Sequence, residues 1–105
     1  NATKVDSILT IIHKEYMNKL TGSYIASKIG MNFDYLNRIF KAQTDMTIFT
    51  YLNTVRINEA KILLINGTSK LNEIALKTGF CDEYHFNRAF KKATGISPGR
   101  WTSNS

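Results

Sequence analysis

Residues 36–41 read Leu-Asn-Arg-Ile-Phe-Lys, and fifty positions later residues 86–91 read Phe-Asn-Arg-Ala-Phe-Lys. In a helix, Leu36, Ile39 and Phe40 fall on one face, because positions i, i+3 and i+4 are neighbours on the helix surface. The Asn, Arg and Lys side chains of the same segment fall on the opposite face. Each copy is therefore predicted to pack its apolar side against a core and to present Asn and Arg outward.

The residues before the first copy predict a helix, a tight turn and a second helix. A short apolar helix that contains Ala26 ends at Gly30, and Asn32 can cap the next helix, at about residues 33–43. The small Ala26 permits a close helix crossing, and Gly30 permits a positive φ in the turn. These are the steric needs of a helix-turn-helix unit, whereas a generic helical hairpin would constrain the two positions less.

The same unit precedes the second copy. Ala75 and Gly79 repeat the four-residue spacing of Ala26 and Gly30, and a helix is predicted at about residues 82–93. The turn before this helix is one residue longer than in the first copy. Because the whole unit occurs twice, the sequence favours paired helix-turn-helix motifs.

The remaining segments complete an all-α fold of about seven helices, in which two homeodomain-like helix-turn-helix lobes are joined by a long connector helix. An amphipathic helix is predicted from about Thr3 to Met17, and a last short helical turn is predicted near Pro98. The expected organisation is a first lobe at residues 1–46, the connector at 47–66 and a second lobe at 67–105. Because the chain begins with Asn rather than Met, we expect it to be a fragment of a longer protein.

Composition and charge restrict the partners. The 105 residues are 43% hydrophobic, which is enough for a folded core, and carry a net charge of +6. A basic protein favours an anionic partner, with nucleic acid as the first candidate and an acidic membrane surface as the second. No apolar run approaches the roughly 20 residues of a spanning helix, so the sequence predicts no membrane insertion.

The sequence offers no recognisable catalytic or metal-binding set. Cys81 is the single cysteine, which excludes an intrachain disulfide and indicates a reducing compartment. With His13 and His85 it shows no familiar metal-ligand spacing, and beside Phe80 it is predicted to be packed. There is no carboxylate pair, nucleophile with a base, or phosphate loop, so neither an enzyme nor a cofactor is expected.

The outward faces of the two repeated helices carry side chains suited to reading DNA. Arg pairs well with guanine, Asn with adenine and acidic groups with cytosine, while Lys and other polar groups bind phosphate. The base-reading candidates are Asp34, Asn37, Arg38, Glu83, Tyr84, His85 and Arg88. The phosphate candidates are Tyr35, Lys41, Asn87, Lys91 and Lys92.

Several of these residues have simpler explanations. Asp34 and Arg38 are spaced i, i+4 and can pair with each other on the surface. Asn37 and Asn87 can bond to backbone near the turn. Glu83 is favoured in the first turn of a helix by the helix dipole alone.

Four segments resemble the DNA-binding domain of AraC/XylS-type bacterial transcription regulators, and together they cover nearly the whole chain. They are residues 35–41, the connector pattern from Tyr51 to Leu64, Ile74-Ala75 to Gly79-Phe80, and Phe86 to Pro98. Two positions depart from the family pattern. Asp45 occupies a position where glycine is common, and Thr102 occupies one where Arg usually follows the aromatic residue.

The resemblance implies a sequence-specific double-stranded DNA-binding domain whose two recognition helices enter adjacent major-groove segments, about 34 Å apart. It also implies the same base-reading positions as above, contact with RNA polymerase, a sensor or dimerisation domain outside this chain, and a cytoplasmic, nucleoid-associated location in bacteria. The competing hypothesis is a helical protein-interaction module with an incidental basic surface. A single-stranded nucleic acid binder is less favoured, because the aromatic residues fall on core-facing positions.

Overall fold

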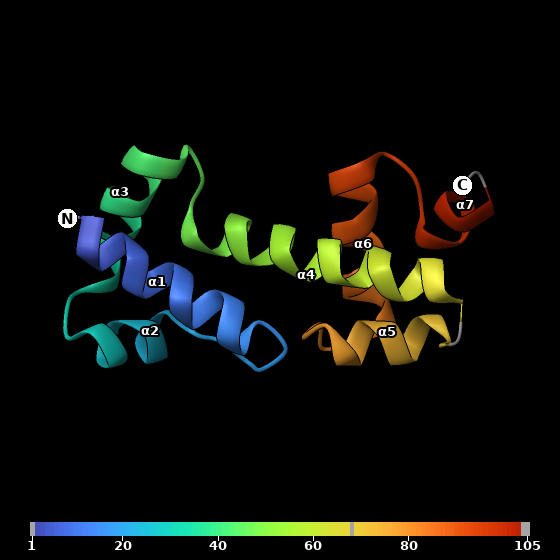
Figure 1. Ribbon diagram of the computed structural model, residues 1–105, viewed down its shortest axis with the longest axis horizontal. Coiled ribbons are helices and arrows are strands. Elements are labelled where there is room, and N and C mark those ends of the chain that lie inside the picture. Colours follow the sequence, from blue (N-terminus) through green and yellow to red (C-terminus); the bar gives the residue numbers. More distant parts are fainter. Residues whose placement is uncertain (1, 68, 104–105) are drawn as a thin grey trace. The chain divides into compact units, whose positions relative to one another are not determined.

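The computed structural model describes residues 2–67 and 69–103. The helices in this part of the chain are α1 (Ala2–Glu15), α2 (Gly22–Ile29), α3 (Phe33–Thr44), α4 (Ile48–Asn66), α5 (Leu71–Lys77), α6 (Glu83–Thr94) and α7 (Pro98–Ser103) (Figure 1). The prediction of an all-α fold with about seven helices is confirmed. The two helices predicted around the repeated segments are α3 and α6, and each has 12 residues.

The chain divides into two compact units, and the division falls inside α4. Unit 1 is Asn1–Leu52 and unit 2 is Asn53–Ser105. In unit 1, α1, α2 and α3 contact one another, and in unit 2, α5 contacts α6 and α6 contacts α7. No helix among the described residues is both long enough and apolar enough to cross a membrane.

The core of unit 1 forms from apolar residues at helical spacing. Ile8 and Ile12 of α1 and Leu36 and Phe40 of α3 have no exposed surface. The predicted amphipathic pattern of both helices is therefore confirmed, although α1 ends at Glu15 rather than near Met17. A buried side chain of this size contributes about 1.5–3 kcal/mol of apolar transfer free energy, so these positions fix which face of α3 points inward.

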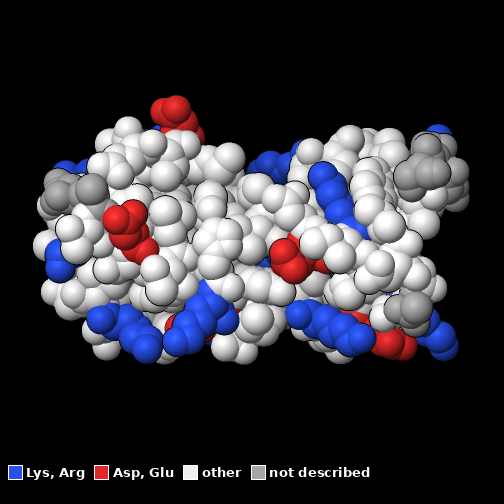
Figure 2. Space-filling model, viewed as in Figure 1, with Lys and Arg blue, Asp and Glu red and all other residues white. Residues whose placement is uncertain are grey.

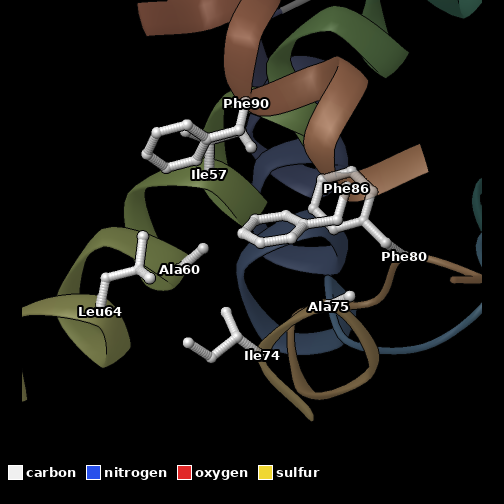
Figure 3. Close-up of a cluster of buried hydrophobic side chains, with 8 residues drawn as sticks. All are labelled: Ile57, Ala60, Leu64, Ile74, Ala75, Phe80, Phe86 and Phe90. Carbon is white, nitrogen blue, oxygen red and sulfur yellow. The ribbon is translucent and has the colours of Figure 1, made fainter. Parts of the chain in front are cut away.

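The core of unit 2 also forms from apolar residues at helical spacing, and Phe86 in α6 occupies the position that Leu36 has in α3. Phe86 and Phe90 point from α6 into a cluster with residues of α4 and α5 (Figure 3). The Phe86 ring centroid lies 5.5 Å from that of Phe80, and the Phe90 ring centroid lies 5.7 Å from that of Trp101. Trp101 thus packs against this core.

Both α3 and α6 begin at a side-chain cap and end in a left-handed residue. Asn32 Oδ1 accepts the N–H groups of Asp34 and Tyr35, and the carboxylate of Asp82 accepts the N–H of His85 at 2.8 Å. The helices end at Asp45, with φ 63°, and at Gly95, with φ 90°. Asp45 therefore adopts the conformation that favours glycine, which Asp tolerates better than most residues.

A hydrogen bond from the repeated Asn distinguishes the two units. In unit 1, Asn37 Oδ1 accepts the N–H of Ile48 at 2.9 Å. Ile48 is the first residue of α4, and the N–H group of a first helical residue has no acceptor within its own helix. The equivalent of Ile48 in unit 2 is Pro98, which has no N–H group, and the buried Oδ1 of Asn87 has no partner among the described residues. Asn37 therefore bonds to backbone near the turn, and Asn87 does not make the same bond.

We predict that Asn37→Ala destabilises the protein by about 1–2 kcal/mol, because it leaves the Ile48 N–H group without its acceptor. Asn87→Ala is the matched control from the repeat. It should destabilise less, since it removes a buried oxygen that has no partner. Urea unfolding followed by circular dichroism measures both, and equal losses in the two variants would contradict this account.

Candidate nucleic-acid interface

The outward face of α3 is formed by polar residues of the first two turns and by a Lys. Asp34, Arg38 and Lys41 are exposed, while Tyr35 and Asn37 are half-buried. The structure has no ion pair between Asp34 and Arg38, although both residues lie in the described part of the chain. Both side chains are exposed, and the Arg38 guanidinium lies over the Tyr35 ring instead of pairing with Asp34.

The outward face of α6 is larger. The exposed side chains are Glu83, Tyr84, His85, Arg88, Lys91 and Lys92, and Asn87 is half-buried. Tyr84 is 62% exposed, so its ring is accessible to a partner. The predicted base-reading and phosphate candidates of α6 other than Asn87 thus share an accessible surface.

Each candidate Arg lies over a Tyr of its own helix. The guanidinium carbon of Arg38 lies 5.9 Å from the centroid of the Tyr35 ring, and that of Arg88 lies 5.7 Å from the Tyr84 ring. Arg88 Nη1 also donates a hydrogen bond to the Tyr84 hydroxyl at 3.3 Å. A cation over an aromatic face gains about 0.5–1 kcal/mol at an exposed site, so the rings restrict the orientations of both guanidinium groups.

Asn37 differs from the other candidates because its carbonyl oxygen bonds to the Ile48 N–H group. Bidentate recognition of adenine needs both the oxygen and the nitrogen of the amide. The base-reading role of Asn37 stays a prediction, but the bond to Ile48 would have to break for that recognition to occur.

Three polar side chains gather at the N-terminal end of α6. His85 Nδ1 lies 2.7 Å from Asp82 Oδ1 and 3.2 Å from Cys81 Sγ. The backbone N–H of His85, and then its side chain, hydrogen-bond to the Asp82 carboxylate and lower its pKa. Cys81 is exposed, so the prediction that it is packed is wrong. Phe80 alone turns into the core, while Cys81 lies in the turn that leads to the helix cap.

The sequence prediction of no metal-ligand set overlooked this group. The Cys81, Asp82 and His85 ligand atoms all lie within 4.8 Å of one another. The spacing Cys-Asp-x-x-His was the available signal. It places one donor in the first turn of a helix and two donors just before it.

Charged side chains occur on both units. Figure 2 shows Lys and Arg side chains at several places on the visible surface of each unit, not gathered in one patch. In unit 2, Arg56 is half-buried with its guanidinium 5.8 Å from the Phe80 ring centroid, and burial lowers its pKa. Arg56 is thus packed against the core, in contrast to the exposed Arg88.

Comparison with known proteins gives matches over most of the chain. A family model described as a helix-turn-helix domain matches residues 25–104. The Msm operon regulatory protein of Streptococcus mutans is 34% identical over 97 residues, which are 92% of this chain and 35% of that protein. The chain therefore spans only a part of this curated relative.

Two solved structures have similar folds. The C-terminal domain of AraT, a response regulator from Geobacillus stearothermophilus, has a TM-score of 0.93 at 27% identity and covers 97% of this chain and 85% of that chain. The DNA-binding domain of AdpA, a global transcriptional factor solved in complex with a target DNA, has a TM-score of 0.86 at 19% identity. This match covers 96% of the chain described here and 90% of the AdpA chain.

Proposed function

The chain belongs to the helix-turn-helix family of AraC/XylS-type transcription regulators, and from this membership we propose that it binds double-stranded DNA sequence-specifically to regulate transcription. The recognition helices are α3 and α6, which read adjacent major-groove segments. The observation that carries the proposal is the repeated outward Arg on a capped helix whose opposite face is buried. A helix anchored in this way offers a polar surface of fixed orientation to the groove.

Arg38 and Arg88 are the principal base-reading residues in this proposal. Both are exposed, and each is held over a Tyr ring, which reduces the conformational entropy lost when the guanidinium binds guanine O6 and N7. Asp34, Glu83, Tyr84 and His85 are secondary candidates on the same faces. Asn37 ranks below them because its oxygen bonds to Ile48.

Phosphate contacts come from the ends of the recognition helices. Lys41 lies in the last turn of α3, and Lys91 and Lys92 lie in the last turn of α6. All three are exposed, and an ammonium group on a flexible stem suits a phosphate better than a base edge. Tyr35 and Asn87 are half-buried, so they require a close approach of the DNA backbone.

The whole protein is proposed to be longer than this chain. The Streptococcus mutans relative is a regulatory protein of which the match covers 35%, which leaves room for a sensor or dimerisation domain. A bacterial cytoplasmic, nucleoid-associated regulator that contacts RNA polymerase is consistent with that arrangement. The chain itself is proposed to act by binding and to catalyse no reaction.

We predict that Arg38→Ala and Arg88→Ala each weaken binding to the specific duplex by about 1–3 kcal/mol and relax specificity at one block of the site. Binding to random duplex should change much less. Fluorescence anisotropy with both duplexes at fixed salt measures the difference. Equal losses on the two duplexes would show that the Arg side chains contact phosphate only.

Lys92→Ala is expected to behave differently from the Arg variants. It should weaken specific and random duplexes alike and reduce the slope of log affinity against log salt by about one, because it removes one phosphate contact. Affinities at several salt concentrations give this slope. A change in base preference without a change in slope would contradict the assignment.

Enrichment of random duplexes of about 25 base pairs tests the proposed function directly. Selection by this chain, followed by sequencing, should return two blocks about ten base pairs apart, one for each recognition helix. Selection with Arg38→Ala and Arg88→Ala should each lose information in one block. No binding by a folded chain would instead support the protein-interaction hypothesis.

A further inference from the structure

The group formed by Cys81, Asp82 and His85 brings together three different donor atoms. It includes neither of the principal base-reading residues of the proposed function, and only His85 is a secondary candidate. The His85 ring nitrogen Nδ1 lies 2.7 Å from Asp82 Oδ1 and 3.2 Å from Cys81 Sγ, and all three donor atoms lie within 4.8 Å of one another. All three residues are exposed, and the side chains of His85 and Asp82 are 58% and 55% accessible. An ion from solvent can therefore reach every donor without unfolding the chain.

We propose that Cys81, Asp82 and His85 form a binding site for a borderline divalent metal ion of the Zn²⁺ type. Thiolate sulfur, imidazole nitrogen and carboxylate oxygen are the three kinds of protein ligand that Zn²⁺ accepts. Mg²⁺ and Ca²⁺ require oxygen ligands almost exclusively, so a site with sulfur and nitrogen discriminates against them. Three protein ligands leave the fourth tetrahedral position to water or another small ligand.

The observed distances are close to those of such a site. Adjacent donors around tetrahedral Zn²⁺ lie about 3.3–3.6 Å apart, given metal bonds of about 2.0–2.3 Å. The Nδ1 to Oδ1 and Nδ1 to Sγ distances are 2.7 and 3.2 Å, so an ion needs to separate these pairs by roughly half an ångström. The third pair, Cys81 Sγ and the Asp82 oxygen, lies within 4.8 Å and has to reach the same spacing. Rotations of exposed side chains supply that movement, and the backbone of α6 stays in place.

The protonation change upon metal binding is simple. The Cys81 thiol loses its proton to solvent, and His85 binds the ion through an unprotonated Nδ1, so a proton on that nitrogen has to leave to solvent. Oδ1 of Asp82 accepts the backbone N–H of His85 and also lies beside Nδ1, and a carboxylate oxygen has a second lone pair with which it can bind the ion while the N–H bond stays. The helix cap is therefore compatible with metal binding. An ion on Nδ1 also leaves Nε2 as the protonated ring nitrogen, which makes His85 a hydrogen-bond donor on its outer side.

Titration of the chain with Co²⁺ under a non-thiol reductant tests the site without any DNA, so its result is independent of the proposed function. We expect a thiolate-to-cobalt charge-transfer absorption that reaches its plateau at one ion per chain and is abolished by added Zn²⁺. Mg²⁺ in large excess should not reduce it. No thiolate band, or a plateau at half an ion per chain, would overturn the intrachain site.

Matched variants identify the ligands. Cys81→Ser should abolish the charge-transfer band, and His85→Gln should weaken the apparent Co²⁺ affinity at least about tenfold. Asp82→Asn keeps a good helix cap but removes the carboxylate, so it should lower the affinity while circular dichroism stays unchanged. His13→Gln changes the other histidine of the chain and should leave the titration unaffected. Unchanged affinity in both His85→Gln and Asp82→Asn would show that Cys81 binds the ion without them.

Discussion

Burial of one face of each recognition helix is the constraint from which the surface of both units follows. Phe40 in α3 and Phe86 and Phe90 in α6 have no exposed area. Because each residue turns a helix by about 100°, fixing these positions also fixes where every other side chain points. Arg38 and Arg88 are outward for this reason. The polar surface is therefore determined by the apolar packing behind it.

The two units bury the same positions of their recognition helices. Their outward faces repeat Asn, Arg and Lys but differ one turn earlier, where Asp34 and Tyr35 correspond to Tyr84 and His85. Side-chain volume restricts substitutions in a close-packed core, whereas substitutions at exposed positions usually change the free energy of unfolding very little. At Arg38 the supporting ring is three residues earlier, and at Arg88 it is four residues earlier. The pair in α6 has an additional hydrogen bond. Two units with one fold thus present different side chains on their outward faces.

The ends of the recognition helices differ in sequence between the two units but keep the same backbone conformation. Asp45 and Gly95 both adopt positive φ after a recognition helix, although only one of them is glycine. The bond from Asn37 to the first N–H of α4 has no counterpart at Pro98, because proline at the first position of a helix needs no acceptor. The helix after each recognition helix therefore begins in a different way in the two units. In unit 1 a side-chain hydrogen bond satisfies its first N–H group, and in unit 2 proline has no N–H group and a φ fixed near the helical value.

The sequence by itself determined the repeated unit, the helices, the cap at Asn32, and the outward position of Arg38 and Arg88. These features depend on residues within a few positions of one another, which helical periodicity places reliably. Only the tertiary structure decided that Asn37 bonds to Ile48, eleven residues away, and that Cys81 is exposed beside His85. Periodicity states which face a side chain occupies. It does not state which atom from another segment, or from an irregular turn, the fold brings to that face.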